Sequence, residues 1–323
     1  EGSDADGAED TGGGGASAPG AAVANGPMGG SIQTGSLDLV GAVTTFAGSP
    51  GETGTEDGTG DAARFLYPKS ITTDGEHLYL LSEGSIDYVS GTKPYYIRKI
   101  DLDTAEVTTL VEFENGQWST LTNDGSELYL TVFDRVYQVD AETGASTELA
   151  QVSGATFLGA TTDGEYLYLT EEGSGLSGVV YRIDIASGAA ELFVEGEELG
   201  GIEGITTNGS SLFVADPSQD AVLEIDIETQ SISTLASAMI NVAAIATDGE
   251  ILYVAGPTVS PAVATIDIAA GTFAYLTGHQ TGVGSADGDT ETAQFSKPGS
   301  FTTDGESLYL TDGADNHTVR KIN

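Results

Sequence analysis

One turn pattern recurs six times along this chain. Small or β-branched residues precede an Asp-Gly or Asn-Gly pair, and alternating apolar residues follow it, as in "ITTDGEHLYL" from residue 71. These pairs supply the positive φ angles that a two-residue hairpin turn needs. An aromatic residue occupies the same place after every turn: Tyr79, Tyr129, Tyr168, Phe213, Tyr253 and Tyr309. The repeat therefore predicts six copies of one β-unit.

A second hairpin follows the first in five of the units, as in "IRKIDLDTAEVTTL" from residue 97. An aspartate ends the third strand each time, where its carboxylate can accept hydrogen bonds from turn amides: Asp101, Asp140, Asp184, Asp226 and Asp267. Successive Asp-Gly or Asn-Gly turns lie 39 to 56 residues apart, a spacing that fits one four-stranded propeller blade. The predicted fold is all-β: a six-bladed β-propeller with four antiparallel strands per blade.

The two ends of the repeat array complement each other. Residues 43–80 match residues 273–310, so "VTTFAG" at 43–48 corresponds to a fourth, outermost strand with no first three strands before it. The last unit has only three strands and ends with "VRKIN". We expect the N-terminal strand to complete the last blade, because an open ring would expose sheet edges and apolar faces. The residues expected to close the ring are Val43, Thr44, Thr45, Phe46, Val319 and Lys321.

Composition separates residues 1–36 from the propeller at 37–323. The first segment is rich in Gly, Ala and acidic residues, and cannot bury enough apolar surface to order itself. We interpret it as a tail that either tethers the propeller or docks on a neighbouring copy. The first residue is Glu, so a processed chain that is secreted or exposed at the cell surface is expected.

Charge limits the partners of the chain. With 50 acidic and 10 basic residues the net charge is −40, which repels phosphate and argues against a nucleic-acid partner. This acidity serves either solvation, especially in salty water, or the capture of cations such as Ca²⁺. The absence of Cys excludes disulfides and thiolate metal sites. No apolar run approaches 18 residues, so no membrane span is expected.

Two segments carry a longer motif, "GTEDGTGDAARFLYPKSITTDGEHLYL" in unit one and "GSADGDTETAQFSKPGSFTTDGESLYLTDGADNHTVRKI" in unit six. A Gly-Asp-Gly-type loop, Ala-x-Phe-x-x-Pro, an inner strand and a Tyr strand follow in order, and the sequence resembles the NHL-repeat family of six-bladed β-propellers. Units two to five keep the hairpins but lose the acidic loop. The resemblance implies a family used mostly for binding and scaffolding. It also includes some metal-dependent lyases and lactonases, which place His, Glu, Asn or Asp around the axis.

The candidate metal ligands of this chain are few. His77, His279 and His317 do not share equivalent inner positions, so a His-based metal centre is not expected. A Ca²⁺ centre at the axis would use Glu203, with Asn241 and Asn123 as additions. Four aspartates of the two acidic loops are the other candidates for a Ca²⁺ site: Asp57, Asp61, Asp287 and Asp289. The alternative for Asp57 and Asp287 is a structural role, in which they bond loop amides. No other cofactor is expected.

Strand alternation places the short turns on one face and the long connections on the other, and we assign the acidic loops to the second face as well. Long, varied loops on a rigid scaffold are where binding usually occurs. Two basic pairs, Arg98-Lys99 and Arg320-Lys321, lie at equivalent places in third strands, and we expect them to pair with carboxylates of neighbouring blades. The chain is thus interpreted as a secreted or cell-surface, non-enzymatic module for protein interaction or structure. Its partner is another protein or, through residues 1–36, a second copy in a filament or surface layer. The competing interpretation is a Ca²⁺-dependent lactonase or lyase with its site at the central axis.

Overall fold

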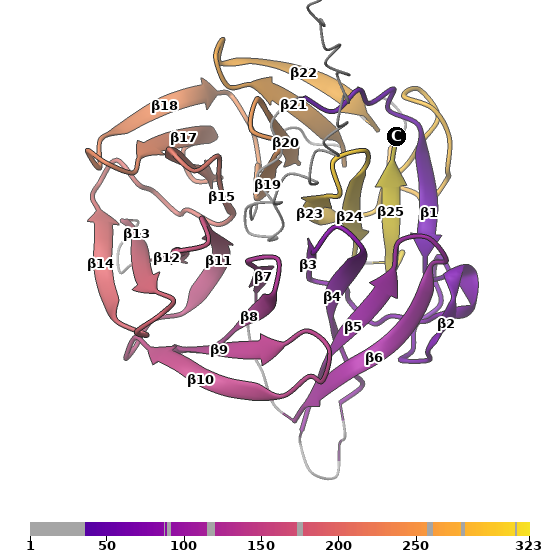
Figure 1. Ribbon diagram of the computed structural model, residues 1–323. Coiled ribbons are helices and arrows are strands. Elements are labelled where there is room, and N and C mark those ends of the chain that lie inside the picture. Colours follow the sequence, from indigo (N-terminus) through magenta and orange to yellow (C-terminus); the bar gives the residue numbers. More distant parts are fainter. Residues whose placement is uncertain are drawn as a thin grey trace, which may run out of the picture.

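The ring of strands that the repeats predict is present. The computed structural model describes residues 36–86, 88, 92–114, 120–172, 177–256, 261–278, 282–313 and 315–323. In these residues the strands form six sheets around a common axis, and the only helical element is a 3₁₀ turn, η1 (Gly60–Ala62). Figure 1 views the ring along this axis. The predicted six-bladed β-propeller with four-stranded antiparallel blades is confirmed.

Each blade is an antiparallel meander whose first strand is the innermost one (Figure 1). Blade 1 contains β3 (Ser70–Thr73), β4 (His77–Glu83), β5 (Tyr95–Asp101) and β6 (Glu106–Phe113), with β2 (Gly58–Thr59) added outside β6. Blade 2 contains β7 (Leu121–Asn123), β8 (Glu127–Val132), β9 (Arg135–Asp140) and β10 (Ser146–Gln151). Blade 3 contains β11 (Phe157–Thr162), β12 (Tyr166–Glu172), β13 (Gly178–Asp184) and β14 (Ala190–Glu195).

The remaining blades follow the same order. Blade 4 contains β15 (Ile205–Thr207), β16 (Ser211–Asp216), β17 (Ala221–Asp226) and β18 (Ile232–Ser237). Blade 5 contains β19 (Ala244–Thr247), β20 (Ile251–Ala255), β21 (Val263–Asp267) and β22 (Thr272–Thr277). Blade 6 takes β23 (Pro298–Thr303), β24 (Leu308–Asp312) and β25 (Thr318–Ile322) from the C-terminal end, and β1 (Val43–Ala47) from the N-terminal end.

Blade 6 therefore closes the ring as predicted. Strand β1 pairs antiparallel with β25, with Val43 opposite Ile322, Thr44 opposite Lys321, Thr45 opposite Arg320 and Ala47 opposite Val319. The register shifts between Thr45 and Ala47, and the intervening Phe46 packs edge-on against Tyr309 at 5.2 Å between ring centroids. The two ends of the described chain thus meet inside blade 6, within one sheet.

The Asp and Tyr that recur in the repeats form one hydrogen-bonded unit. In blade 2 the phenol of Tyr129 donates to the carboxylate of Asp124 at 2.6 Å, and the same carboxylate accepts from turn amides. Burial and this hydrogen bond raise the pKa of Tyr129 above its usual range. Blades 1, 3, 5 and 6 repeat the pair at 2.6 to 3.0 Å, whereas blade 4 has Asn208 and Phe213, so both members are changed together.

The core is divided among the contacts between neighbouring blades. Six hydrophobic clusters of buried residues are present in the described part of the chain, one at each blade interface. The cluster at the interface between blades 6 and 1, which we call the seam, includes Ala47 and Val319 of blade 6 and Phe65, Ile71 and Leu78 of blade 1, all fully buried. Burying a Phe or Leu side chain contributes roughly 1.5–3 kcal/mol. The seam is therefore packed as the other interfaces are.

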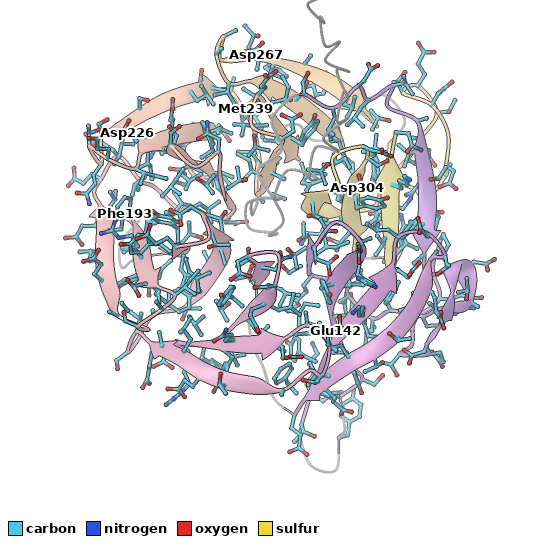
Figure 2. All side chains as sticks on the ribbon, viewed as in Figure 1. Glu142, Phe193, Asp226, Met239, Asp267 and Asp304 are labelled. Atoms are coloured by element: carbon cyan, nitrogen blue, oxygen red, sulfur yellow. The ribbon has the colours of Figure 1, made fainter. Side chains whose placement is uncertain are left out.

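Alternation of the strands gives the ring two different faces. The turn face carries the connections from first to second and from third to fourth strands, including those at Asp226, Asp267 and Asp304 (Figure 2). The loop face carries the connections from second to third strands and those that enter each first strand.

Leu37 reaches the turn of blade 5, where its backbone N–H donates to the buried Asp248 at 2.9 Å. No helix in the described residues is long and apolar enough to cross a membrane.

Candidate functional site

The two acidic loops lie over the outer edges of blades 1 and 6, which corrects the expectation that they belong to the loop face. In blade 1, β2 within the loop pairs with β6, the outermost main strand. In blade 6, Gly288 forms the equivalent bridge to Val43 of β1, through hydrogen bonds of 2.7 and 3.0 Å. The loops fold back in this way because each covers a buried guanidinium that needs acceptors.

Arg98 is the buried guanidinium of blade 1, with no solvent exposure. One terminal nitrogen donates to Asp57 at 2.6 Å and to the carbonyl of Glu56 at 3.1 Å, and the other donates to the carbonyl of Arg64 at 3.2 Å. The guanidinium also lies 5.4 Å from the ring centroid of Phe65. Asp57 additionally accepts from the hydroxyl and backbone N–H of a threonine in β6, Thr109.

Arg320 repeats this arrangement in blade 6 and adds a second carboxylate. It donates to Asp287 at 2.8 Å, to Asp312 at 3.1 Å and to two loop carbonyls. Arg320 and Asp312 are both fully buried. Asp287 also accepts from the hydroxyl of Thr45 at 2.9 Å, which ties β1 into the blade. Arg98 and Arg320 thus pair with carboxylates as predicted, but these carboxylates belong to their own blades and not to neighbouring ones. Lys99 does pair with a neighbouring blade, at 2.8 Å from Glu142, whereas Lys321 forms no ion pair among the described residues.

Asp312 connects this buried pair to the loop face. Its carboxylate accepts from the backbone N–H groups of Ser296 at 2.9 Å and Lys297 at 2.8 Å, and from the amide of Asn316. Burial raises the pKa of Asp312, although the donors of Asn316, Lys297 and Arg320 act in the opposite direction. The backbone of Lys297 is therefore fixed by a group that reaches from the interior.

Tyr67 is fixed in a similar way from the other side of the seam. Its backbone N–H donates to Nδ1 of His317 at 3.2 Å, and the two rings meet edge-on at 4.9 Å. This bond requires an unprotonated Nδ1, and burial lowers the pKa of His317. Tyr67 has a φ of 45°, in the left-handed region that disfavours a bulky residue. The neighbouring structure must therefore hold it there.

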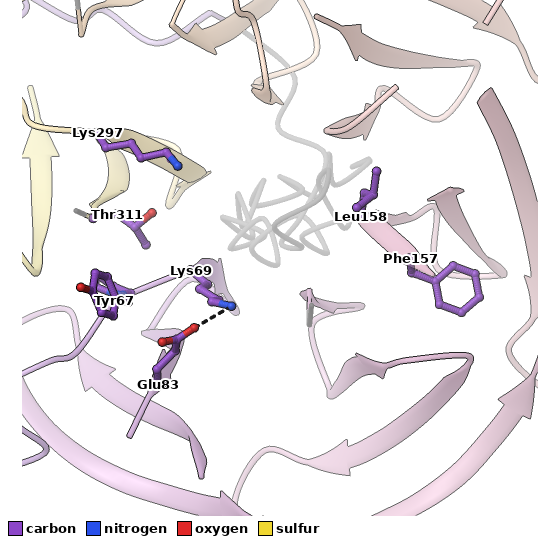
Figure 3. A pocket seen from close by; sticks show the side chains of 10 residues that line it. Tyr67, Lys69, Glu83, Phe157, Leu158, Lys297 and Thr311 are labelled. Carbon is purple, nitrogen blue, oxygen red and sulfur yellow. Dashed lines mark ion pairs between the residues drawn. The ribbon is translucent and has the colours of Figure 1, made fainter. Parts of the chain in front are cut away.

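A pocket of about 330 Å³ opens at the place where these two supports meet. We call it the junction pocket. Figure 3 shows Lys69, Glu83, Lys297 and Thr311 on one side of it and Leu158 across the ring. Its lining residues come from blades 1, 3 and 6: Tyr67, Pro68, Lys69, Glu83, Phe157, Leu158, Lys297, Gly299, Thr311 and Gly313. The volume lies at the lower end of the range for ligand sites, roughly 300–1,000 Å³.

Glu83, on one wall of the junction pocket, forms ion pairs with two lysines. One carboxylate oxygen bonds Lys69 at 2.8 Å and the other bonds Lys93, and both ammonium groups lie within 6 Å of the centroid of Tyr95. Burial alone would raise the pKa of Glu83, but the hydrogen bonds from Lys69 and Lys93 outweigh burial and lower it. The carboxylate is therefore ionised, and the group of two lysines and one glutamate carries a net single positive charge.

The predicted axial Ca²⁺ ligands are not gathered at one place. Asn123 lies at the turn-face end of β7 and donates to Thr72 and to the carbonyl of Thr73. Glu203 is exposed at the loop-face end of the inner strand of blade 4, and Asn241 lies in the connection that enters blade 5. Among the described residues no group of three or more His, Cys, Asp or Glu side chains is arranged to hold a metal ion.

The four loop aspartates have other partners or lie at the surface. Asp57 and Asp287 bind the buried arginines. Asp289 accepts from Thr292 and the N–H of Glu291, and these bonds lower its pKa. Asp61 is exposed, and its backbone carbonyl accepts from Arg64. Ca²⁺ binding by this set stays a prediction.

The histidines differ in their surroundings. His77 lies 3.3 Å from the turn carboxylate of Asp74, and His317 supports Tyr67. His279 falls outside the described residues.

Sequence reasoning did not select Tyr67, Lys69, Glu83 or Lys297. The signal was present but divided between the two ends of the chain: Lys69 follows the Pro of the first long motif, and Lys297 precedes the Pro of the second. Ring closure makes these two motifs neighbours. Combining the closure prediction with the position of the two lysines would have indicated the junction pocket.

Comparisons with known proteins agree on the fold and go no further. No family model matches the sequence, and no curated protein matches it either. A protein of unknown function from Bacteroides thetaiotaomicron is similar in structure, with a TM-score of 0.64 and 20% identity over 87% of this chain and 75% of that one. A candidate phosphatase from the same organism has a TM-score of 0.58 and 15% identity over 87% and 78% of the two chains.

TolB from Acinetobacter baumannii is more distant, with a TM-score of 0.49 and 16% identity over 71% of this chain and 59% of that one. At 20% and 15% identity, the likeness to the two Bacteroides thetaiotaomicron proteins shows the fold alone. The chain is a six-bladed β-propeller, and its membership of the NHL-repeat family stays a prediction.

Proposed function

We propose that this propeller is a protein-interaction module that binds its partner on the loop face, with the junction pocket as the polar centre of the contact. The observation that carries the proposal is the distribution of exposed large apolar side chains. Five of them lie in connections of the loop face: Tyr67, Ile86, Tyr88, Phe133 and Ile240, between 43% and 89% exposed. No described hairpin turn of the turn face carries one, and the exposed apolar residue on that side is Val40, in the segment that leads into β1. Protein contacts are enriched in aromatic residues of this kind.

The proposal includes a location and a role for the tail. An acidic, Cys-free chain suits a secreted or cell-surface protein, and residues 1–36 would tether the propeller or join copies of it. Leu37, the second residue that the structure describes, approaches the turn face, on the side opposite to the loop face. An NHL-like ancestry and a non-enzymatic role are part of the same proposal.

A crosslinking capture with matched surface variants tests the docking face. The purified full-length chain is incubated with extract and secreted material from its own source, beside the variants Tyr88→Asp and Phe133→Asp on the loop face. Phe273→Asp on the outermost strand β22 is the control, because Phe273 is also exposed, at 41%. We expect the loop-face variants to lose a partner that the wild type and the control retain. Equal capture by all variants would contradict the proposal.

Sedimentation velocity tests the role of the tail. The full chain should form larger species than a chain that starts at residue 36, if the tail joins copies. Identical sedimentation of the two chains would leave the tail as a tether and rule out assembly through it.

A further inference from the structure

The junction pocket contains a lysine that stands apart from the other basic residues. All ten Lys and Arg residues lie in the described part of the chain, and eight of them form ion pairs with acidic side chains. The two exceptions are Lys297 and Lys321. Lys321 lies over the ring of Tyr309 at 5.4 Å, whereas Lys297 has neither an acidic nor an aromatic partner among the described residues. Within the described residues, this chain with 50 acids thus leaves one ammonium group of a pocket without an acidic partner.

The backbone of this lysine is held rather than free to move. Asp312, fully buried, accepts the N–H of Lys297 at 2.8 Å and is itself bound to Arg320. Fixing the backbone reduces the number of side-chain positions that an incoming anion must order. An exposed lysine on an irregular surface needs no ligand. A lysine placed at a pocket mouth by a buried ion pair is better explained by a ligand that it binds.

The rest of the pocket defines the kind of anion. Lys69 adds a second ammonium, but Glu83 offsets half of the charge that Lys69 and Lys93 bring. The charged residues of the lining, Lys69, Lys297 and Glu83, therefore carry one net positive charge, and Lys93 adds a second positive charge next to the pocket through its bond to Glu83. Pro68 and Leu158 provide apolar surface, and Tyr67 adds a half-exposed ring at the rim. A carboxylate attached to an apolar group matches this combination of charge, surface and volume.

We propose that the junction pocket binds a carboxylate joined to an apolar residue, as at the C-terminal end of a peptide, with Lys297 as the main charged contact. This inference rests on the proposed function, because it names the chemical group that a protein partner would insert at the centre of the loop face. A free organic acid has the same chemistry, so the experiment separates the two sources.

Calorimetric titration of the full-length protein at about 0.15 M salt tests the inference. At this salt, repulsion from the acidic surface is screened beyond roughly 8 Å. The probes are the tripeptide acetyl-Ala-Ala-Phe with a free C-terminal carboxylate, and the same tripeptide as its C-terminal amide. Phenylacetate and phenylacetamide form a second pair, which matches the size of the apolar group without the peptide. We expect both carboxylates to bind, the peptide more tightly, and neither amide to bind measurably.

Two lysine variants locate the site. Lys297→Gln should weaken binding of the carboxylate tripeptide by about tenfold or more, as expected for the loss of a charge-assisted contact. Lys321→Gln is the matched control, because it makes the same change of net charge outside the pocket and should leave binding unchanged. Lys297 is exposed and its side chain contacts no described acid, so the first variant is expected to fold. Circular dichroism and the melting temperature check this for both.

Each result decides between the alternatives. No binding of either carboxylate, or an equal effect of the two lysine variants, would overturn the inference. Binding of phenylacetate without the peptide would overturn the peptide source and identify a site for free organic acids. If Tyr88→Asp loses the captured partner while Lys297→Gln keeps it and the tripeptide does not bind, the carboxylate inference fails and the proposed function stands. If the tripeptide binds but no loop-face variant affects capture, the carboxylate inference stands and the proposed docking of a partner on the loop face fails.

Discussion

Blades 1 and 6 differ from blades 2 to 5 at one equivalent position of the third strand. This position holds Arg98 and Arg320 in the first group, opposite Leu80 and Leu310 of the second strand. In blades 2 to 5 the same position holds an aromatic or apolar residue: Tyr137, Tyr181, Leu223 and Ala264. At this position a guanidinium occurs in the two blades whose acidic loop supplies carboxylate and carbonyl acceptors. A buried charge needs such acceptors, so we expect the arginine and the loop to depend on each other.

The same two blades also differ at their outer edges. Strand β6 is covered by β2, and β1 is covered by the bridge to Gly288. In the described residues, the outermost strands β10, β14, β18 and β22 pair with one neighbour only. Because blades 1 and 6 are adjacent, the additional loops strengthen the junction where the ring closes. The pocket on the loop face lies at this junction.

The largest expected effect is the loss of the fully buried arginine. Arg320→Ala would leave the buried carboxylate of Asp312 without its cation, and we expect the free energy of unfolding to fall by about 3–5 kcal/mol. Urea denaturation measures the change. Arg98→Ala should cost less, because its partner Asp57 is half-exposed and can be hydrated. Equal costs for the two variants would contradict the difference drawn between the two blades.

Acid should weaken the turns between third and fourth strands in blades 1 to 3. Hydrogen bonds from the hydroxyl and backbone N–H three residues later hold the pKa values of Asp101, Asp140 and Asp184 below their usual range. A carboxyl with a lower pKa in the folded state stabilises fully above its unfolded pKa of about 4. This stability is lost as the pH falls through the lower, folded pKa.

Unfolding free energies measured between pH 7 and pH 3 check this expectation. The triple replacement of these aspartates by Asn should flatten the acid limb of the profile. An unchanged acid limb would show that other carboxyl groups determine the acid sensitivity.

A smaller effect is expected from the Asp–Tyr pair that blade 4 lacks. Tyr129→Phe removes one hydrogen bond to Asp124 and should cost about 0.5–1.5 kcal/mol. Adding Asp124→Asn reproduces the Asn and Phe of blade 4, and the double variant should cost less than the sum of the two single variants. A double-mutant cycle by thermal or urea unfolding measures the coupling, and strict additivity would argue against a shared unit.

The smallest effect belongs to the ion pairs on the outer surface of blades 2 and 3. Arg135 and Glu148 are each about 40% exposed, and Arg135→Ala should change the free energy of unfolding by at most about 1 kcal/mol. The free energy of unfolding of Arg320→Ala, measured in the same way, shows how much more a buried arginine contributes than an exposed one. A large effect of Arg135→Ala would mean that burial does not separate the two groups of arginines.

Most of the fold was predictable because its signals are local and repeated. Asp-Gly turns mark each first hairpin, and alternation of apolar residues specifies the strands, so six blades follow from spacing alone. Ring closure was predictable because the matching fragments around Val43 and Val319 are each incomplete. The path of the acidic loops was predicted wrongly. Nothing in the loop sequence itself shows that Asp57 reaches Arg98, which is 41 residues away.

The candidate site was less accessible to sequence reasoning for the same reason. Lys69 and Lys297 are 228 residues apart, and each alone is an ordinary surface lysine. Their common pocket depends on closure of the ring and on supports such as Asp312 and His317, whose bonds cross between segments. Residue type and spacing drew attention to the acids, which are numerous. The rarer basic residues were more informative once the fold was known.

The central claim is that the ring is firmly closed inside blade 6, where the N-terminal strand β1 pairs with β25. Native-state hydrogen exchange on the full-length protein tests it by comparing two equivalent outermost strands, β1 of blade 6 and β6 of blade 1. We predict that the amides of β1, including the N–H of Val43 bonded to Gly288 at 2.7 Å, exchange as slowly as those of β6. Exchange of the β1 amides orders of magnitude faster than those of β6 would contradict the claim, because it would show a ring that opens at its ends.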